Sequence, residues 1–471
     1  MSRLDNSSKR KFQISGWGYR FLRLFTVIHP GEAGTTWLLS LTMFLLMMGY
    51  YFLRPLRQAL ILTEWSPNLA SYLGGAIAVL LIFVVKIFSH IASKVPRQKL
   101  ITWVTLFFIS NLILFYIIYE AGVSPAVISI IFYVWLGVFN LMVVAQFWGF
   151  CNDLYTEEAG KRLFPLIVFG TNFGALVGGL TASRILGPLN PYQIMLLTAG
   201  LLAICIVLTH VVHNREIKKA KKEKLKNPVP GEEPIKEEEK PLEQGGGFRL
   251  IFKSRYLIYI AFFILVLNFI NTNGEFILLN VANYTASTAI ETGQAESLDH
   301  SVLVGRFYSN FYTIMNLITI FIQLFLVSRI FKWFGVRTAV FILPFIALGG
   351  YFTIGLGVSL IAVRWIKSLE NATDYSLMNT TKHALFLITS REEKYKAKAA
   401  TDTFFHRAGD VLTAILVFVC AAFFALDFEN IQNISIIARI NVGIVLVFIL
   451  LGVLIAREHK RHSYHLAKSE A

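Results

Sequence analysis

Two arginines in the first long apolar stretch are the side chains best suited to chemistry in this chain. Tyr50, Arg54, Arg57 and Gln58 lie in YYFLRPLRQALILTE at helical spacing, so they share one helix face. A guanidinium stays charged and offers forked donors that match phosphate or carboxylate oxygens. Pro55 between the arginines can bend the helix and free a carbonyl. The pattern predicts an anion site; the alternative is that both arginines extend to lipid headgroups.

A second charged face lies in residues 361–383, a stretch long enough to cross a bilayer as a helix. Its polar positions step by three and four, so they fall on one stripe. Ionisable residues inside a membrane are costly and usually mark a substrate or ion pathway. We therefore predict that this stripe lines a transport pathway. Its charged members are Arg364, Lys367, Glu370, Asp374 and Lys382.

The composition places these residues in a membrane protein. Hydrophobic residues make up 55% of the 471 residues and charged residues 15%, and the mean hydropathy is +0.59, all outside the range of a soluble domain. We predict an all-α integral membrane fold of twelve transmembrane helices in two six-helix halves. The predicted spans lie near residues 36–58, 69–92, 100–120, 126–150, 163–184, 192–213, 255–279, 302–328, 337–357, 359–387, 402–426 and 433–456.

Basic residues concentrate before the first predicted span and in every second loop, while the opposite loops nearly lack them. This positive-inside pattern predicts a multi-pass membrane protein with both termini in the cytoplasm, and we expect it in a bacterial inner membrane. The net charge of +15 follows from that topology, so no nucleic-acid partner is expected. The segments expected are a cytoplasmic N-terminus with an interfacial helix (1–35), a six-helix half (36–213), a cytoplasmic linker (214–250), a second six-helix half (251–456) and a tail (457–471). Two such halves resemble the major facilitator architecture, in which the halves rock around a central site.

Polar side chains also gather in the seventh and eighth predicted spans. Asn268, Asn271 and Glu275 lie in the seventh, and Arg306 and Tyr308 in the eighth. Amides and tyrosines can surround a base or a sugar, and they equally join membrane helices to one another. We expect the amides and Tyr308 to contact substrate. Glu275 and Arg306 are expected to pair as a gate.

Glycines in the fifth predicted span repeat at steps of four. Gly170, Gly174 and Gly178 lie in GTNFGALVGG, which predicts a close helix-packing seam. The segment also resembles a glycine motif of major facilitator antiporters, with Ala175 where proline is usual. The sequence has no phosphate-cradling glycine loop, metal-ligand cluster or Ser/His/Asp set, so we expect neither an enzyme nor a cofactor.

At these same residues the chain resembles the ATP:ADP antiporter family of plastids and intracellular bacteria, which is related to the major facilitators. Arg54 keeps the family arginine of the first span, and Arg57 stands where the family has lysine. The clearest match is YSLMNTTKHALFLITSREEKYKAKAATDTFFHRAGD, on which Lys382 coincides with a lysine implicated in nucleotide transport. Tyr375 falls on a matching position. The resemblance implies a nucleotide exchanger whose basic residues bind phosphate.

The seventh span departs from that family, which reads approximately Asn-Leu-Val-Glu-x-x-x-Lys. Asn271 replaces the acid, and Glu275 replaces the base. We therefore expect a purine nucleotide or another phosphorylated metabolite as substrate.

The expected function is alternating-access transport of a small anion by a monomer in the bilayer. Arg54, Arg57 and Lys382, helped by Arg364 and Lys367, are expected to neutralise phosphate, and Glu370 and Asp374 to hold bases of the empty site. Unpaired cations are costly, which favours exchange over uniport. Two alternatives stay open: proton-coupled transport of another organic anion or drug, with Glu275 or Asp374 titrating, and a non-transporting receptor or scaffold.

Overall fold

The computed structural model describes residues 32–92, 95, 97–155, 157–226, 247–294, 298–390, 393, 397–428 and 430–470. Its long helices are α2 (Ala33–Glu64), α3 (Pro67–Ala92), α4 (Arg97–Glu120), α5 (Pro125–Leu154), α6 (Glu157–Ile185), α7 (Pro191–Lys226), α9 (Arg255–Glu291), α10 (His300–Phe321), α11 (Val327–Gly355), α12 (Leu360–Thr373), α15 (His406–Phe423) and α16 (Ile434–Glu470). Shorter helical segments are α8 (Gly247–Lys253), η1 (Ile322–Leu326), η2 (Asp374–Met378), α13 (Asn379–Leu385), η3 (Phe386–Ile388), α14 (Lys398–Ala400), η5 (Thr401–Phe405) and η6 (Ile431–Asn433). The interfacial helix predicted within residues 1–31 lies outside the described residues.

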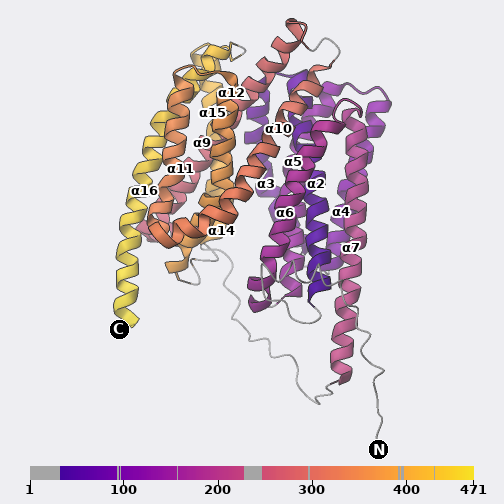
Figure 1. Ribbon diagram of the computed structural model, residues 1–471, viewed down its shortest axis with the longest axis vertical. Coiled ribbons are helices and arrows are strands. Elements are labelled where there is room, and N and C mark those ends of the chain that lie inside the picture. The colour runs from indigo at the N-terminus through magenta and orange to yellow at the C-terminus, as the bar shows by residue number, and fades with distance from the viewer. Residues whose placement is uncertain are drawn as a thin grey trace, which may run out of the picture.

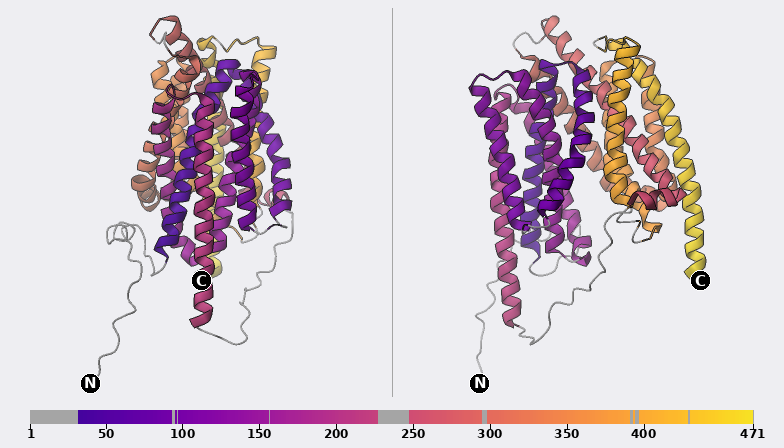
Figure 2. Two further views of the ribbon diagram at one scale, coloured as in Figure 1. Left: turned by 90° about the vertical axis from the view of Figure 1, so that its right-hand side faces the viewer. Right: turned by 180° about the vertical axis from the view of Figure 1, so that it is seen from behind.

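The helices gather in two groups, which Figure 1 shows beside each other and Figure 2 shows from two further sides. We call α2–α7 the N-terminal group and α8–α16 the C-terminal group. The buried residues of one apolar core come from positions 39–212, and those of a second from positions 251–455. A third core draws buried residues from both groups, including Tyr51 and Tyr312. Each group therefore packs around its own interior, and the third core joins them.

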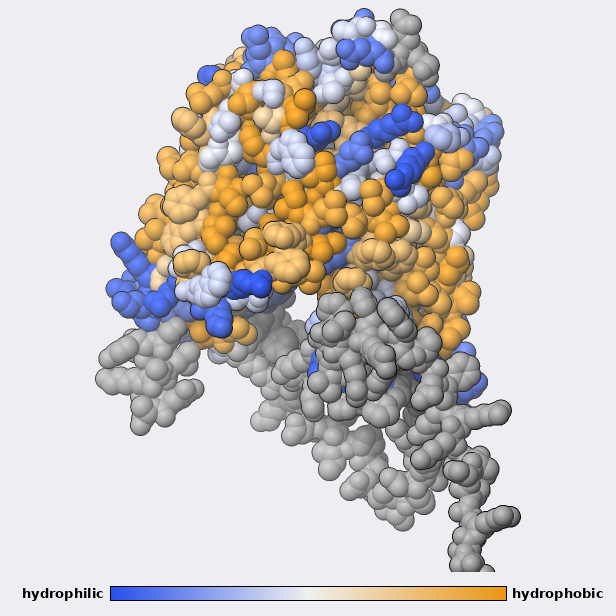
Figure 3. Space-filling view, in the orientation of Figure 1, coloured by the Kyte–Doolittle hydropathy of each residue, from blue (hydrophilic) through white to orange (hydrophobic). Residues whose placement is uncertain are grey.

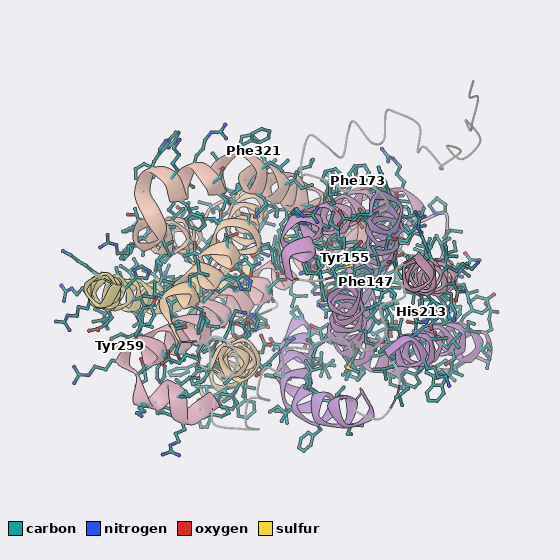
Figure 4. All side chains as sticks on the ribbon, turned by 90° about the horizontal axis from the view of Figure 1, so that it is seen from below. Phe147, Tyr155, Phe173, His213, Tyr259 and Phe321 are labelled. Carbon is teal, nitrogen blue, oxygen red and sulfur yellow. The ribbon has the colours of Figure 1, made fainter. Side chains whose placement is uncertain are left out.

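Three helix pairs make the extensive contacts between the groups. Helix α10 packs on α2 and α6, and α3 packs on α15. Seen from below in Figure 4, the labelled Phe147, Tyr155 and His213 lie in the N-terminal group. Tyr259 and Phe321 lie at the rim of the C-terminal group in the same view. The boundary between the groups is thus formed mainly by α2, α3, α6, α10 and α15.

The predicted glycine seam is confirmed between α2 and α6, the most extensively packed helix pair. A Cβ atom on Gly170, Gly174 or Gly178 would collide with a backbone carbonyl oxygen of α2. The next glycine, Gly179, instead faces Thr313 of α10. The repeat therefore fixes how closely α6 can approach α2, and its last member lies at the boundary between the groups.

Ten helical segments of the described chain are long and apolar enough to cross a membrane, where the sequence predicted twelve spans. The predicted eighth and ninth spans lie in one helical stretch, His300–Gly355, which bends at Gly335. Gly335 has a φ of 72°, a conformation that side chains with a Cβ rarely adopt. The predicted tenth span is helical from Leu360 to Ile388, but its charged residues keep it outside the ten.

Two helices continue past the predicted ends of their membrane spans. Helix α7 runs to Lys226, past the predicted end of its span at residue 213, and α16 runs to Glu470 through the predicted tail. Both extensions are rich in alanine, lysine, arginine and glutamate, which are strong helix formers in water. Helix propensity therefore continues these helices beyond their apolar stretches. Residues 227–246 of the predicted linker lie outside the described residues.

The outer surface is largely apolar. Large hydrophobic side chains such as Trp103, Phe321, Phe345 and Leu450 are more than half exposed. Figure 3 shows an apolar belt across the visible face, with hydrophilic residues toward its upper edge and at its lower left. The lower edge of the described surface is notched between the two groups. A broad apolar belt with polar ends is the surface expected of helices surrounded by lipid.

Candidate functional site

Arg54 and Arg57 point toward the boundary between the helix groups. The Arg54 guanidinium lies 4.2 Å from the ring centroid of Tyr312 on α10, and its Nη2 donates to Tyr375 Oη of η2 at 3.4 Å. The Arg57 guanidinium lies 4.6 Å from the ring of Tyr133 on α5. The alternative in which both arginines extend to headgroups therefore does not fit their positions. Stacking on phenol rings favours a guanidinium held away from bulk water.

Tyrosines from four helical segments surround the two arginines. The ring of Tyr51 meets that of Tyr312 edge-on at 5.7 Å, and Tyr308 lies 5.7 Å from Tyr312. We call this set the arginine–tyrosine cluster; its members are Tyr50, Tyr51, Arg54, Arg57, Tyr133, Tyr308, Tyr312 and Tyr375.

The cluster keeps unused hydrogen-bonding capacity. Tyr308 and Tyr312 are fully buried, and neither hydroxyl has a hydrogen-bond partner among the described residues. Arg57 Nε and Gln58 Oε1 are also buried atoms without a hydrogen-bond partner among the described residues. Buried polar groups are normally satisfied, so unpaired ones next to two guanidinium groups indicate a place where a ligand or water completes the site.

Neither arginine of the cluster forms an ion pair within the described part of the chain. The ion pairs there use other bases, and five of the pairs lie in the C-terminal group, among them Lys367 with Glu370, Lys382 with Asp374 and Arg407 with Asp410. Among the described residues, the partners of Arg54 and Arg57 are phenols. Two cations without a carboxylate are chemically ready for an anion.

The charged stripe of residues 361–383 contacts this cluster at a π-helical turn, η2. Such turns insert an extra residue into a helix and often occur at functional sites. Within η2, Tyr375 contacts Arg54, while the neighbouring Asp374 accepts from Asn271 Nδ2 at 3.4 Å. Lys382 Nζ lies 3.8 Å from Asp374 Oδ1, so Asp374 holds this base as predicted. The turn thus connects Arg54 of the N-terminal group to Lys382 of the C-terminal group.

Lys367 does not fit its predicted contact with substrate. Its side chain is fully buried, with Nζ 2.8 Å from Glu370 Oε2 and 3.2 Å from Tyr351 Oη. The hydroxyl of Tyr351 is shared between Glu370 Oε1 and Ile270 O. Gly274 on α9 has no side chain, which leaves room for Lys367. Glu370 therefore holds a base, as predicted, but in a network that joins α9, α11 and α12. Arg364 lies near Phe307 of α10, 5.9 Å from its ring.

Asn268 also differs from its prediction. Its Nδ2 donates to His406 O and Asp410 Oδ1 at 2.6 and 2.8 Å, and Thr272 donates to the same carboxylate oxygen. Asp410 pairs with Arg407 at 3.2 Å. Asn268 thus joins α9 to α15. Of the two amides expected at the site, Asn271 lies beside Asp374 and Asn268 does not.

The predicted pair of Glu275 and Arg306 is absent. Arg306 Nε and Nη2 both donate to Leu186 O at 3.2 Å, at the end of α6, while Glu275 accepts from Asn371 Nδ2 at 3.0 Å. The exposed carbonyl at a helix C-terminus is a good acceptor for arginine. Arg306 therefore joins α10 to α6, and Glu275 joins α9 to α12.

The sequence analysis did not identify Tyr133, which stacks on Arg57, or Asp410, which accepts from Asn268. Tyr133 lies in a largely apolar run without charged neighbours at helical spacing, so no charge pattern singles it out. The i, i+3 spacing of Arg407 and Asp410 was a usable signal for that pair. A separate pocket lined by Thr42, Gln146 and Cys205 lies inside the N-terminal group and includes none of the predicted site residues.

The protein-family comparison matches residues 39–369 to the Major Facilitator Superfamily. The chain belongs to this superfamily. Among solved structures, this major facilitator is similar to the nucleoside transporter NupG, with a TM-score of 0.59, 13% identity and coverage of 88% of this chain and 98% of that one. A bacterial homologue of the iron transporter ferroportin in an inward-facing state matches with a TM-score of 0.60, 11% identity and coverage of 91% and 100%. These likenesses show the fold.

Curated relatives confirm the resemblance to ATP:ADP antiporters. ADP,ATP carrier protein 1 of Chlamydia trachomatis is 23% identical over 60% of this chain and 57% of its own length. The chloroplastic ADP,ATP carrier protein 1 of Arabidopsis thaliana is 23% identical over 72% of this chain and 55% of its own length. The match to this major facilitator thus covers less than two thirds of the length of each of these relatives.

Proposed function

We propose that this major facilitator is a secondary transporter that moves a phosphorylated anion, a nucleotide such as ATP or ADP, by alternating access and exchange. The observation that carries the proposal is the pair Arg54 and Arg57 at the boundary between the helix groups, which has no carboxylate partner among the residues that the structure describes. The ADP,ATP carrier relatives support the nucleotide. No enzymatic activity is proposed.

Binding is proposed to use both helix groups. Arg54 and Arg57 of α2 would take phosphate oxygens from one side, and Lys382 would leave Asp374 to take others. The 3.8 Å separation of Lys382 and Asp374 is long for an ion pair, so an anion can compete for the lysine. Substrate bound between groups is what couples binding to their relative movement.

Exchange follows from the cost of the empty site. When the groups close around Arg54 and Arg57 without an anion, two cations stay uncompensated in a low-dielectric interior. A bound phosphate removes that cost. Reorientation is therefore faster for the loaded carrier, and net release without a counter-substrate is slow.

The membrane arrangement proposed is twelve spans in two halves, 36–213 and 251–456, with residues 214–250 as cytoplasmic linker, 1–35 and 457–471 as cytoplasmic ends, and a monomer in a bacterial inner membrane. The loop charges support this orientation. In it, the contact of Arg306 with Leu186 closes the outer end, and the notch between the groups opens toward the cytoplasm.

The test is counter-exchange in proteoliposomes. Vesicles preloaded with labelled ADP are diluted into buffer with or without unlabelled ATP, and efflux is measured for the wild type, Arg57→Ala and Lys382→Ala. ATP should accelerate efflux for the wild type and not for either variant. Arg461→Ala is the matched control, because Arg461 is 70% exposed near the end of α16. Equal efflux with and without any external anion would refute exchange.

One observation favours a second candidate, proton-coupled transport of another organic anion. Asp374 is 9% exposed, and its only described cation is Lys382 at 3.8 Å. Such a carboxylate can take up a proton when the lysine turns to substrate. Uptake driven by an imposed pH gradient, lost in Asp374→Asn, would select this mechanism over exchange.

A further inference from the structure

Glu275 differs from three other acids inside the C-terminal group. Glu370, Asp374 and Asp410 each lie within 4.0 Å of a lysine or arginine. Among the described residues Glu275 has no cation at that distance, and its one hydrogen-bond partner there is Asn371 Nδ2 at 3.0 Å. A carboxylate offers about four acceptor positions. Glu275 therefore keeps most of its accepting capacity unused.

The position of Glu275 puts that capacity beside the arginine–tyrosine cluster. It lies one helical turn after Asn271, whose side chain meets Asp374. The hydrogen-bond donor of Glu275, Asn371, lies one helical turn before Tyr375, whose hydroxyl accepts from Arg54 Nη2. The carboxylate of Glu275 on α9 and the guanidinium of Arg54 on α2 thus contact the same turn of helix, residues 371–375.

This arrangement gives the site two chemically different ends. A phosphate is attracted by Arg54 and Arg57 and repelled by Glu275. A carboxylate without a cation in a membrane interior is costly, and a donor from the substrate would remove part of that cost. The phosphate and the donor of one bound molecule would then point to opposite ends.

We infer that Glu275 is a specificity-determining residue that accepts a hydrogen bond from a donor group, a hydroxyl or an amine, on the non-phosphate end of the transported anion. This inference deepens the proposed function and rests on it. It assigns Glu275 to substrate recognition, where a gate with Arg306 was expected. In a nucleotide, the donor is either a ribose hydroxyl or the exocyclic amine of the base.

The test compares ligands that differ only in donors. Inhibition of labelled ADP exchange is measured with ADP, 2′,3′-dideoxy-ADP, purine riboside diphosphate, which lacks the exocyclic amine, and inorganic pyrophosphate. For the wild type, one of the two modified nucleotides should bind about tenfold or more weakly than ADP, the loss typical of a hydrogen bond to a charged group. The modified nucleotide that loses affinity identifies the donor.

Glu275→Gln should remove most of that discrimination while leaving the affinity for pyrophosphate within about twofold. Glu291→Gln is the matched control, since Glu291 is the exposed last residue of the same helix. If Glu275→Gln does not support exchange, the same four ligands are compared by thermal stabilisation of the purified variant, together with Glu275→Asp. Glu275→Asp keeps the charge and should keep part of the discrimination.

The possible outcomes distinguish failure of the inference from failure of the proposed function. Exchange of ADP with equal discrimination in wild type and Glu275→Gln overturns the inference and leaves the proposed function standing. Equal inhibition of the wild type by all three nucleotides also overturns it. If no phosphorylated anion supports exchange or stabilises the wild type, the proposed function fails, and the inference fails with it. A Glu275→Gln variant that loses only pH-driven uptake would make Glu275 a proton carrier, contrary to the inference.

Discussion

Arg54 of α2 donates a hydrogen bond to Tyr375 of η2 at 3.4 Å, across the boundary between the helix groups. The same guanidinium stacks on Tyr312 of α10. One side chain of the N-terminal group thus contacts two segments of the C-terminal group. Any anion that draws Arg54 from these phenols changes contacts between the groups, which is the physical requirement for coupling binding to movement.

Substitutions of this pair are predicted to have unequal effects. Tyr375→Phe removes one long hydrogen bond to Arg54 and leaves its charge, so KM for nucleotide exchange should change by less than about threefold. Arg54→Ala removes a charge-assisted phosphate contact and should raise KM by about tenfold or more. Initial rates of exchange over a range of nucleotide concentrations measure both values. Equal effects of the two substitutions would contradict a phosphate contact for Arg54.

The buried pair of Lys367 and Glu370 is predicted to support stability and not substrate contact. Lys367→Met leaves a buried carboxylate without its cation and should lower the free energy of unfolding by about 3–5 kcal/mol. The double variant Lys367→Met, Glu370→Gln should recover most of that loss. Thermal unfolding in detergent measures both.

The matched control is Lys398→Met, because the Lys398 to Asp402 pair is partly exposed and should contribute less than about 1 kcal/mol. A stable Lys367→Met variant with impaired nucleotide binding would instead return Lys367 to the substrate site.

The seam between α2 and α6 predicts a strong dependence on side-chain size. Gly174→Ala places a methyl group against the backbone of Phe44 and should destabilise the protein by about 1–3 kcal/mol. Gly200→Ala on α7 is the control, because no atom lies within 4 Å of the added methyl group. Melting temperatures in detergent compare the two. Equal melting temperatures would show that the helices can separate without cost.

The contact of Arg306 with Leu186 predicts a leak when it is lost. Arg306→Ala removes both hydrogen bonds that hold α10 to the end of α6. Efflux of preloaded nucleotide without counter-substrate should rise about fivefold or more, as expected when about 1–1.5 kcal/mol is removed from a closed state. Arg306→Lys keeps one donor and should leak less. Unchanged efflux in both variants would exclude this contact as an outer closure.

The sequence predicted much of the fold because membrane helices leave a strong hydropathy signal. Each of the twelve predicted ranges is occupied by helix, and the glycine steps identified the α6 seam correctly. The number of membrane spans and the lengths of the helices were harder to predict. The charged helix beginning at Leu360 has an atypical composition, Gly335 joins two spans by a bend, and α7 continues into water by propensity.

The sequence identified the charged residues of the site, but it could not predict the role of a residue whose contacts come from a neighbouring helix. The spacing placed Arg54 and Arg57 on one face and Asp374 and Lys382 on one stripe; in the structure Arg54 contacts Tyr375, next to the Asp374 that pairs with Lys382. Lys367 lies on the same stripe as Lys382, but its burial depends on Gly274 and Tyr351, which are distant in sequence. Periodicity places a residue on a helix face and does not say which neighbouring helix covers it.

The most direct test of the central claim is the thermal stability of the purified protein in detergent with ATP, ADP, inorganic phosphate, a sugar phosphate and a dicarboxylate. A ligand at one hundred times its Kd adds about 2.7 kcal/mol of stability to the folded protein. The account predicts that ATP or ADP raises Tm of the wild type and of Arg461→Ala, and that Arg57→Ala and Lys382→Ala lose the shift. Stabilisation by nucleotide that persists in both of these variants, or no stabilisation of the wild type by any anion, would contradict it.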